Sequence, residues 1–438
     1  MKYRDYQLMS KETRSKIVPK LRFPKFLDDD WKETTLGAIA DLIDERAGKN
    51  EHVLMSVTSG IGLISQREKF GREIAGSQYK NYYAIKKWDF AYNKSATKLY
   101  PEGYIAMLRD MDSAAVPNSV FTCFRITDKK AVPQFLDFLF HDNFHGKWLR
   151  KFIEVGARAH GSLSVDIDAL FNMPVFLPSS AEQQKIADCL SSLDELITAQ
   201  SQKLEAIKAH KKALMQQLFP DEGETVPNLR FAEFRDTGEW VSKTLGQCLL
   251  QHPDYGINAP AVPYSNNLPT YLRITDISEN GFFLKNQMVS VAKDVTDVNY
   301  LREGDIVLAR TGASVGKSYK YRVEDGELVF AGFLIRVKPD RNNLNSELLF
   351  QYFSTEQYWR WVDFTSTRSG QPGINSNEYA SMPILLPPSL EEQQKIAHCL
   401  SSLDELITTQ TKKIEELRKH KKGLMQQLFP NTSYSNKL

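Results

Sequence analysis

Hydrophobic residues recur in steps of four and three positions through two long segments of the chain, and this spacing predicts two long helices. The apolar positions of the first segment are Ile186, Leu190, Leu193, Ile197, Leu204, Ile207, Leu214 and Leu218. Those of the second segment are Ile396, Leu400, Leu403, Ile407, Ile414, Leu417, Leu424 and Leu428. Such a narrow apolar seam is typical of a helix that packs in a coiled coil.

Signals for helix ends flank both segments. Ser179 or Ser180 precedes the first segment and Ser389 precedes the second, each with glutamate and glutamine close behind; this pattern is favoured where a helix begins. Pro220 and Pro430 follow the segments, and proline cannot continue a helix. We therefore expect two helices of about 37 residues each, roughly 55 Å long.

The two segments are also copies of each other. Glu182–Pro220 and Glu392–Pro430 are identical at 29 of 39 aligned positions. A weaker copy stands at the front of each half, where the chain reads VPKLRF from Val18 and VPNLRF from Val226. Between these markers the two halves have little in common. The chain therefore consists of two copies of one unit, each with a variable body and a nearly duplicated tail.

The matching seams favour an intramolecular coiled coil. Antiparallel pairing, which we expect, would place the two bodies at opposite ends around a pseudo-two-fold axis. The alternative is that each helix packs on its own body or forms a homodimer. Gln200 and Lys211 interrupt the first seam, and Gln410 and Lys421 interrupt the second. Such residues either fix the register of the pair or lie at the edge of the seam with their polar ends in water.

Short strands dominate the predicted structure of both bodies. In the second body we expect strands at 271–277, 305–310 and 328–337 and a helix over 344–362; in the first body we expect a strand at 88–91. The predicted fold class is α+β, with two globular mixed α/β domains joined by two long helices that pair as an antiparallel coiled coil.

These elements predict four segments. Residues 1–178 contain the N-terminal tail and the first globular domain, and residues 179–220 form the central helix. Residues 221–388 form the second globular domain, and residues 389–438 contain the distal helix and the C-terminal tail.

A glycine-rich segment of the second body, Thr311–Lys317 (TGASVGK), is similar to a phosphate-binding loop. A Walker A motif needs four residues between its glycines, whereas Gly312 and Gly316 are separated by three, so nucleotide hydrolysis is not expected. Two interpretations remain. Backbone N–H groups and Lys317 approach a phosphate of DNA, or the segment is a hairpin that requires glycine.

Polar loops supply candidate DNA-contacting residues, because arginine and glutamine side chains suit the edges of guanine and adenine. These loops are Thr365–Asn375 in the second body, and Val155–Ser164 and the residues after strand 88–91 in the first. The candidates are Tyr92, Asn93, Lys94, Arg158, His160, Ser162, Arg310, Thr311, Ser314, Lys317, Arg368, Ser369 and Gln371.

The amino-acid composition indicates the class of protein more clearly than the net charge does. A content of 42% hydrophobic and 25% charged residues is normal for a soluble globular protein. The net charge of only +2 requires any DNA-binding charge to be localised on one face. The four cysteines form no C-x-x-C pair, which indicates a reducing, cytoplasmic location and no zinc or other metal site. No apolar run is long enough to span a bilayer.

Motifs for catalysis are missing from the sequence. There is no Asn/Asp-Pro-Pro-aromatic motif of an adenine methyltransferase, no H-E-x-x-H motif and no dinucleotide fingerprint. His160 beside Arg158 is a single histidine in a loop and does not form a catalytic dyad. We therefore expect a binding protein without catalysis or cofactors of its own.

Several motifs together resemble the specificity subunits of type I restriction-modification systems. In the second half these are MPILLPPSL from Met382, EEQQKIAHCLSSLDELI after it, and YLRITDISENG, LREGDIVLARTGASVGK and FAGFLIRVKPD in the body. In the first half, Phe176–Ile197 matches the helix motif, and VTSGIG and WDFAYNKSATKLYPEGYIAML resemble another class of target-recognition domain. The first body lacks a TGASVGK-type loop, so the family's DNA-contact roles transfer less directly there.

The resemblance implies a function and a set of partners. Each target-recognition domain would read one half of a split, asymmetric site in double-stranded DNA, and the helices would set the spacing between half-sites. Two methyltransferase subunits would dock on the chain, and restriction and translocase subunits would join them. S-adenosylmethionine, ATP and Mg²⁺ would be bound by these partners. A reader in a methylation-only system is a close alternative; a coiled-coil scaffold that does not bind DNA, or an enzyme, are the more distant ones.

Overall fold

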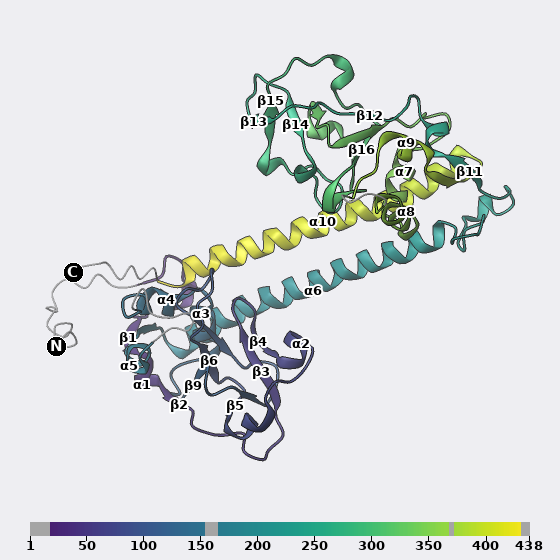
Figure 1. Ribbon diagram of the computed structural model, residues 1–438. Helices are drawn as coiled ribbons and strands as arrows, with labels where there is room; N and C mark the ends of the chain where they lie inside the picture. Colours follow the sequence, from purple (N-terminus) through teal and green to yellow (C-terminus); the bar gives the residue numbers. More distant parts are fainter. Residues whose placement is uncertain (1–17, 154–164, 368–371, 431–438) are drawn as a thin grey trace. The chain divides into compact units, whose positions relative to one another are not determined.

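A computed structural model describes residues 18–153, 165–367 and 372–430 and divides the chain into two compact units. The first unit contains Met1–Gln200 and Lys413–Leu438, and the second contains Ser201–Lys412. We call the part of the first unit before the central helix the first body, and the part of the chain between the two long helices the second body (Figure 1). The units divide both long helices, which the sequence-based boundaries treat as separate segments.

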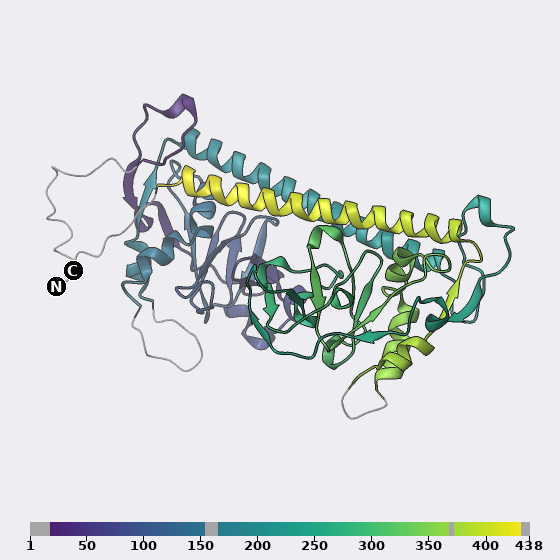
Figure 2. The ribbon, with the colours of Figure 1, turned by 90° about the horizontal axis from the view of Figure 1, so that it is seen from above.

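The two long helices are α6 (Ser180–Leu218) and α10 (Leu390–Leu428), of 39 residues each. In the first unit, Leu190 near the start of α6 shares one hydrophobic core with Leu428 at the end of α10. In the second unit, Leu400 near the start of α10 shares a core with Leu218 at the end of α6. The start of each helix therefore meets the end of the other, and the expected antiparallel pairing is confirmed (Figures 1 and 2).

Two four-stranded sheets form the first body. One has the order β2-β9-β6-β7, with antiparallel pairs throughout, and the other has the order β4-β3-β8-β5, with β3 and β8 parallel. The strands are β2 (Ala40–Leu42), β3 (Val53–Thr58), β4 (Gly62–Ser65), β5 (Tyr83–Lys86), β6 (Phe90–Asn93), β7 (Tyr104–Met107), β8 (Ser113–Val116) and β9 (Phe121–Ile126). The helices are α1 (Leu36–Ile39), α2 (Gln66–Phe70), α3 (Pro133–His141), α4 (Phe144–Leu149) and α5 (Ile167–Phe171).

The second body also contains two four-stranded sheets, of order β12-β19-β16-β17 and β13-β15-β14-β18. The strands are β12 (Asp254–Tyr255), β13 (Ala261–Pro263), β14 (Thr270–Leu272), β15 (Val289–Val291), β16 (Ile306–Ala309), β17 (Ser318–Lys320), β18 (Leu328–Phe330) and β19 (Leu334–Val337). Its helices are α7 (Ser346–Tyr352), α8 (Glu356–Ser366) and α9 (Ser376–Ser381).

The bodies share a strand order that their sequences do not reveal. The first sheet has the same order and the same antiparallel pairing in both, with β2, β9, β6 and β7 corresponding to β12, β19, β16 and β17. The second sheets share a hairpin with a parallel third strand, β4-β3-β8 in one and β15-β14-β18 in the other. They differ in the fourth strand, because β5 adds beside β8 whereas β13 adds beside β15.

Hydrophobic packing attaches each first sheet to the long helices. In the first body the Phe90 and Phe124 rings stack with centroids 5.1 Å apart, and Phe140 of α3 meets Phe90 edge-on at 5.5 Å. These residues belong to the same core as Leu190 and Leu428. In the second body the sheet residues and the aromatic residues of α7 and α8 belong to the core that contains Leu218 and Leu400.

The second body breaks two of its predicted elements into shorter ones. The segment 328–337 forms β18 and β19 with a turn between them, closed by a hydrogen bond of 2.8 Å from the Leu334 N–H to the Ala331 carbonyl. The helix expected over 344–362 is interrupted because the Thr355 hydroxyl accepts a hydrogen bond from the Tyr358 N–H and starts α8 there. The strand expected at 271–277 ends at Leu272.

A short sheet stands before each long helix. In the first unit β1 (Lys32–Thr35) pairs with β10 (Pro174–Leu177), and in the second β11 (Val241–Thr244) pairs with β20 (Pro383–Leu386), both antiparallel. β1 and β11 belong to the lead-ins, and β10 and β20 come just before the long helices. In each unit the start and the end of the body are therefore paired strands next to the long helix that follows. Across the described ranges, we find no helix with the length and apolar character needed to cross a membrane.

Candidate nucleic-acid interface

Arg310 follows β16 in the second body and is half-buried at its surface. The centre of its guanidinium lies 4.8 Å from the centroid of the Tyr255 ring, a distance typical of a cation–π contact. The Tyr255 hydroxyl accepts a hydrogen bond of 3.0 Å from the Ser376 N–H, which holds the ring in place. Within the described ranges Arg310 has no carboxylate partner. Its N–H donors are therefore ordered and free to bind an acceptor.

The glycine-rich loop after Arg310 uses its backbone donors internally. The N–H groups of Gly312, Gly316 and Lys317 donate to carbonyl oxygens of the second body at 3.2, 2.9 and 3.0 Å. Gly316 has a φ of 86°, and a Cβ there would lie 2.8 Å from Val362. These contacts favour the hairpin interpretation of TGASVGK over a phosphate cradle. The Lys317 ammonium donates to Glu279 at 2.8 Å, but this carboxylate is almost fully exposed.

The structure brings this loop together with the polar segment Thr365–Asn375. Thr311 forms an isolated antiparallel bridge with Gly373, and the Ile374 N–H donates to the Arg310 carbonyl at 2.9 Å. A pocket of about 260 Å³ opens between the two segments. Its lining residues are Arg310, Thr311, Thr365, Gly373, Ile374, Asn375 and Glu378.

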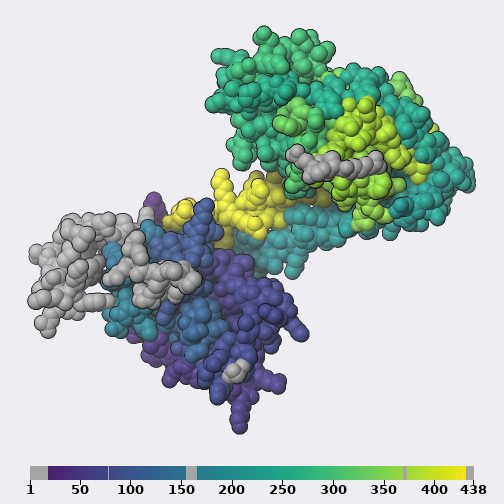
Figure 3. All heavy atoms as spheres, in the orientation of Figure 1, coloured from purple at the N-terminus to yellow at the C-terminus, as the bar shows by residue number. Residues whose placement is uncertain are grey.

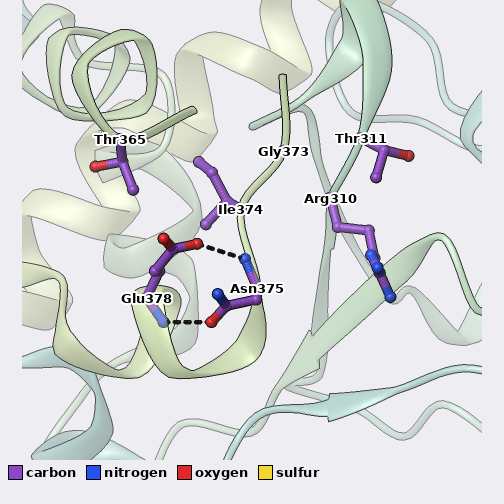
Figure 4. A pocket seen from close by; sticks show the side chains of 7 residues that line it. All are labelled: Arg310, Thr311, Thr365, Gly373, Ile374, Asn375 and Glu378. Atoms are coloured by element: carbon purple, nitrogen blue, oxygen red, sulfur yellow. Dashed lines mark hydrogen bonds between the residues drawn. The ribbon is translucent and has the colours of Figure 1, made fainter. Parts of the chain in front are cut away.

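Within this pocket the polar groups divide into two sets (Figure 4). Asn375 and Glu378 bond each other at the start of α9, by hydrogen bonds of 2.8 and 3.0 Å between side chains and backbone N–H groups. The Arg310 side chain points away from this pair in Figure 4. The pair is thus occupied in capping α9, whereas Arg310 is not engaged by it.

Six of the candidate DNA-contacting residues lie outside the described residues. They are Arg158, His160, Ser162, Arg368, Ser369 and Gln371. Thr311 and Ser314 lie half-buried at the surface beside Arg310. The roles of all these residues in DNA contact stay predictions.

The structure corrects two predictions in the first body. Tyr92 is completely buried in the core, its hydroxyl donates to the Glu102 carbonyl at 2.7 Å, and burial raises the pKa of its phenol. Asn93 is also buried, and its side-chain oxygen accepts a hydrogen bond from the Ser95 N–H. Neither side chain reaches DNA unless the body opens. Of the three consecutive candidates only Lys94 lies partly at the surface.

Two surface residues of the first body were missed by the sequence reasoning. The Lys69 ammonium donates to the neutral oxygens of Ser56 and Val57 at 3.3 and 3.4 Å and lies 5.2 Å from the centroid of the Phe70 ring, and burial lowers its pKa. Trp88 has a φ of 75°, a strained conformation for a bulky residue. Its ring is partly exposed, with the Lys87 ammonium 5.1 Å from the centroid. A lysine beside an exposed aromatic ring was the signal available in the sequence.

Every predicted seam residue of α6 and α10 faces away from solvent to some extent. The buried ones are Ile186, Leu190, Leu204, Ile396, Leu400 and Ile414, and the half-buried ones are Leu193, Ile197, Ile207, Leu214, Leu403, Ile407, Leu417 and Leu424. Among the polar residues of the seam, Lys211 and Lys421 donate to aspartates of the opposite helix. Their ammonium groups thus have a partner in the seam and are not released to water.

The joint between body and helix is built from the two parts of the sequence repeat. Arg22 of the first lead-in donates to both carboxylate oxygens of Glu182 in α6, at 2.9 and 2.6 Å, and both side chains are buried. Arg230 of the second lead-in donates to Glu392 in α10 at 2.7 Å twice. In both pairs this hydrogen bonding raises the arginine pKa. The repeated LRF and EQQ motifs therefore contact each other in both units.

A buried glutamine completes each joint. The side-chain oxygen of Gln183 accepts from the Val132 N–H at 2.8 Å, and its amide donates to the Lys130 carbonyl at 2.9 Å. Gln393 contacts the second body in the same way, through the Asn345 N–H and the Asn343 carbonyl. Each body is thus held to the first turn of its helix by backbone-directed hydrogen bonds, which position the surfaces described above.

Comparison with known proteins decides the family. The family model for the type I restriction modification DNA specificity domain matches this chain twice, over residues 29–209 and 249–419. The chain belongs to this family. The resemblance stated from the EQQKIA motifs is confirmed, and the two matches coincide with the two copies of the repeat.

Relatives of the family extend the comparison. The chain is 25% identical over 306 residues to a putative type I restriction enzyme MjaX specificity subunit of Methanocaldococcus jannaschii, covering 70% of this chain and 69% of that one. It is 25% identical over 297 residues to the type I restriction enzyme MjaVIII specificity subunit of the same organism, covering 65% and 67%.

Solved structures share the fold. The crystal structure of a type I restriction-modification S subunit from M. genitalium superposes with a TM-score of 0.59 at 15% identity, over 95% of this chain and 100% of that one. A structure from work on complex assembly and conformational transition of the type I system gives 0.52 at 17% identity, over 92% and 98%. At these identities the likeness concerns the fold alone.

Proposed function

We propose that this chain reads DNA sequence for a type I restriction-modification complex and performs no chemistry itself. Each body contacts one half of a bipartite, asymmetric site in double-stranded DNA. One observation carries the proposal: the same joint, with Arg22–Glu182 in one unit and Arg230–Glu392 in the other, holds two bodies that share the strand order of their first sheet and differ in surface. The same joint, repeated with two different surfaces, suits two different half-sites.

Rigid attachment matters for such a reader. Two contact surfaces on one scaffold turn the separation of half-sites into a geometric condition, as in dimeric DNA-binding proteins. The second contact also becomes intramolecular once the first has formed, which raises the affinity for a site with the matching gap. The buried hydrogen bonds of Gln183 and Gln393 support this requirement, since they restrict the rotation of each body on its helix.

In the second body the proposed contact surface is centred on Arg310, with Thr311 and Ser314 beside it. Arginine in a fixed orientation suits a bidentate contact with the O6 and N7 atoms of guanine. The hydroxyl groups of Thr311 and Ser314 suit phosphate or base contacts. Lys317 is proposed to exchange Glu279 for a phosphate, because an ion pair with a largely exposed carboxylate is weak.

For the first body we propose Lys94, Lys69 and the exposed ring of Trp88 as the described contact residues. The ammonium groups would contact phosphates, which position a protein on DNA without reading its sequence. An exposed indole is suited to stack on, or wedge beside, a base. Arg158, His160 and Ser162 remain the proposed base readers of this body.

The helices are proposed to dock two methyltransferase subunits, with restriction subunits joining them and with S-adenosylmethionine, ATP and Mg²⁺ bound by these partners. Support comes from the outer faces of the helices. Leu196 of α6 and Leu406 of α10 occupy equivalent repeat positions and are 40% and 53% exposed. Side chains of α10 (yellow) reach the surface in Figure 3. Because the repeat gives each helix the same exposed position, a partner that binds one helix there can bind the other in the same way.

Methylation in a host tests the proposal. We would co-express the chain with a methyltransferase subunit of a type I system that forms a stable complex with it, and sequence the host DNA for methylated adenine. The expected result is one new motif of two short half-sites with a fixed gap, and replacing either body with that of a relative should change one half-site only. A stable complex that produces no motif would overturn the DNA-reading proposal and favour a scaffold.

A further inference from the structure

Two lysines in the helix seam contact aspartates of the opposite helix. In the second unit the Lys211 ammonium donates to both carboxylate oxygens of Asp404, at 2.6 and 2.7 Å. In the first unit the Lys421 ammonium donates to both oxygens of Asp194, also at 2.6 and 2.7 Å. Because the repeat offset relates Lys211 to Lys421 and Asp194 to Asp404, the same contact is made twice.

Both pairs are largely withdrawn from water. The lysine side chains are each 14% exposed, and Asp404 and Asp194 are 28% and 34% exposed. An ion pair withdrawn in this way contributes little net stability, because desolvation offsets the Coulomb attraction. Losing one partner is costly, however, because the remaining charge stays buried. A pair of this kind therefore discriminates between registers more than it stabilises any one of them.

The pairs also contact the bodies. In the second unit Asp404 accepts a further hydrogen bond of 2.8 Å from the amide of Gln351 in α7, and the same amide donates to Glu347 at 2.8 Å. Glu347 in turn pairs with Lys320 in β17, the strand that follows the Lys317 loop. The chain of contacts thus connects the helix seam with the sheet that carries the candidate DNA surface.

The first unit has an equivalent arrangement with different residues. The Lys421 ammonium lies 5.1 Å from the centroid of the Phe138 ring in α3. The preceding residue of the same helix, Asp137, is buried and forms an ion pair with Arg109, just beyond β7. In each unit the lysine therefore lies where two long helices and one helix of the body meet.

A shift in register would separate these groups. One helical turn is about 5.4 Å, so sliding α6 past α10 by a turn moves each ammonium out of reach of its carboxylate and against apolar seam residues. Leucine and isoleucine positions would tolerate such a slip better, because one apolar contact replaces another. Polar residues at single seam positions are known to select the register of a coiled coil in this way.

We propose that the Lys211–Asp404 and Lys421–Asp194 pairs are positioning residues that fix the antiparallel register of α6 and α10 and the seating of each body on them. On the proposed function, which this inference extends, they set the gap accepted between the two half-sites. They do so without contacting DNA.

Distances between spin labels on the intact chain test the register directly. Labels are attached to cysteines at the exposed positions Lys49 and Lys293, one in each body, after Cys189 and Cys399 are replaced by alanine. Cys123 and Cys248 are buried and do not compete for label. The measurement is a double electron–electron resonance distance distribution of the free protein, so neither DNA nor partners are needed.

The informative variant neutralises both pairs, with Lys211→Met, Asp404→Leu, Lys421→Met and Asp194→Leu together. We expect it to unfold at a temperature no lower than the parent and to give a broadened or displaced distance distribution. The charge-exchanged variant, with Lys211→Asp, Asp404→Lys, Lys421→Asp and Asp194→Lys, should restore the parent distribution. Lys208→Met is the matched control, because Lys208 pairs with Glu205 of its own helix at the surface and with no other carboxylate among the described residues.

Each outcome decides the matter. A neutralised variant with the parent's distribution would overturn the proposal, since the apolar seam alone would then fix the register. If the neutralised chain does not fold, the charge-exchanged variant decides: a parent-like distribution supports the proposal, and a displaced one refutes it.

A second measurement connects the register to DNA. Methylation is measured on duplexes in which the gap between half-sites is lengthened or shortened by one base pair. We expect the preference of the neutralised variant for the parental gap to be about tenfold lower than that of the parent, which corresponds to about 1.4 kcal/mol. An unchanged preference would refute the effect on the gap. If even the parent methylates no bipartite site, the proposed function fails, while the label distances still test the register.

Discussion

The two units repeat the same joint between body and helix, but the side chains inside their bodies differ. At the joint, Arg22 meets Glu182 in the first unit and Arg230 meets Glu392 in the second, and a glutamine follows each glutamate. Further from the helices the likeness is confined to strand order, since the side chains in the two sheets differ. The residues that form the joint are therefore repeated in the sequence, whereas the residues inside the bodies differ.

Two arginine–tyrosine contacts show how the surfaces differ. In the first body Arg46 stacks on Tyr83 at 4.2 Å but also pairs with Asp44. In the second body Arg310 stacks on Tyr255 at 4.8 Å and has no carboxylate partner among the residues described. A paired arginine contributes to the fold of its surface, whereas an unpaired one is available to a ligand. The same contact thus has different uses in the two bodies.

The largest effect is expected from breaking the shared joint. Arg22→Met leaves the Glu182 carboxylate buried without its partner, and Arg230→Met does the same for Glu392. Each change should destabilise its own unit by about 3–5 kcal/mol. Urea unfolding followed by hydrogen exchange of peptides from each body measures the two units separately.

Arg341→Met is the matched control for the joint, because Arg341 and Glu303 are both exposed and such pairs contribute little. Equal losses in the two units would show that the joint is energetically the same. A loss below about 1 kcal/mol in either unit would mean that the buried pair there is replaceable by apolar contact.

A feature of the fold could be predicted from the sequence where its contacts are local along the chain, and not where they join residues far apart in it. The long helices followed from spacing within each segment, as at Leu190 and Leu400, and their pairing with each other followed from the matching seams. The joint did not, because Arg22 and Glu182 are 160 residues apart. Two local repeats were visible in the sequence, but nothing in either showed that one contacts the other.

The candidate site was harder to predict for a related reason. All four residues of β6 are buried, so the strand lacks the apolar–polar alternation that separates a core face from a surface face. Tyr92 was therefore assigned to the surface when it belongs to the core. Tyr255 was missed as the support of Arg310 because β19 lies between β12 and β16 in the sheet, so the two strands are not neighbours.

An intermediate effect, confined to the first unit, is expected from acid. His145 in α4 is completely buried against Tyr92 and Phe140, and burial lowers its pKa to about 4. A histidine in the unfolded chain has a pKa of about 6.5. As the pH falls, the unfolded chain binds the proton first. Stability present above about pH 6.5 is therefore lost between about pH 6.5 and pH 4, by about 3 kcal/mol in total.

The second unit is the internal reference for this pH effect, because the loss of stability is expected in the first unit. Urea unfolding at pH 7.5 and pH 5, followed by exchange in β6 and β7 and corrected for intrinsic rates, should show the loss in the first body. His145→Gln keeps a donor for the Gly103 carbonyl, which lies 3.1 Å from the histidine Nε2, and removes the titration. If the variant retains the full pH dependence, another group is responsible.

The smallest effect should appear in the second body alone, at its candidate DNA-contacting surface. Arg310→Ala removes a guanidinium that is ordered by Tyr255 and unpaired within the described ranges, without taking a charge from the core. If Arg310 reads a guanine, affinity for a bipartite duplex falls by about 1–3 kcal/mol, and selectivity is relaxed at one position of one half-site. Arg302→Ala is the control, since Arg302 also stacks on a tyrosine of this body, at 5.9 Å from the Tyr300 centroid. Binding is measured on duplexes substituted one base pair at a time. If Arg310→Ala weakens binding equally for all of them, the arginine contacts a phosphate, and the bases must be read by other residues of the same surface.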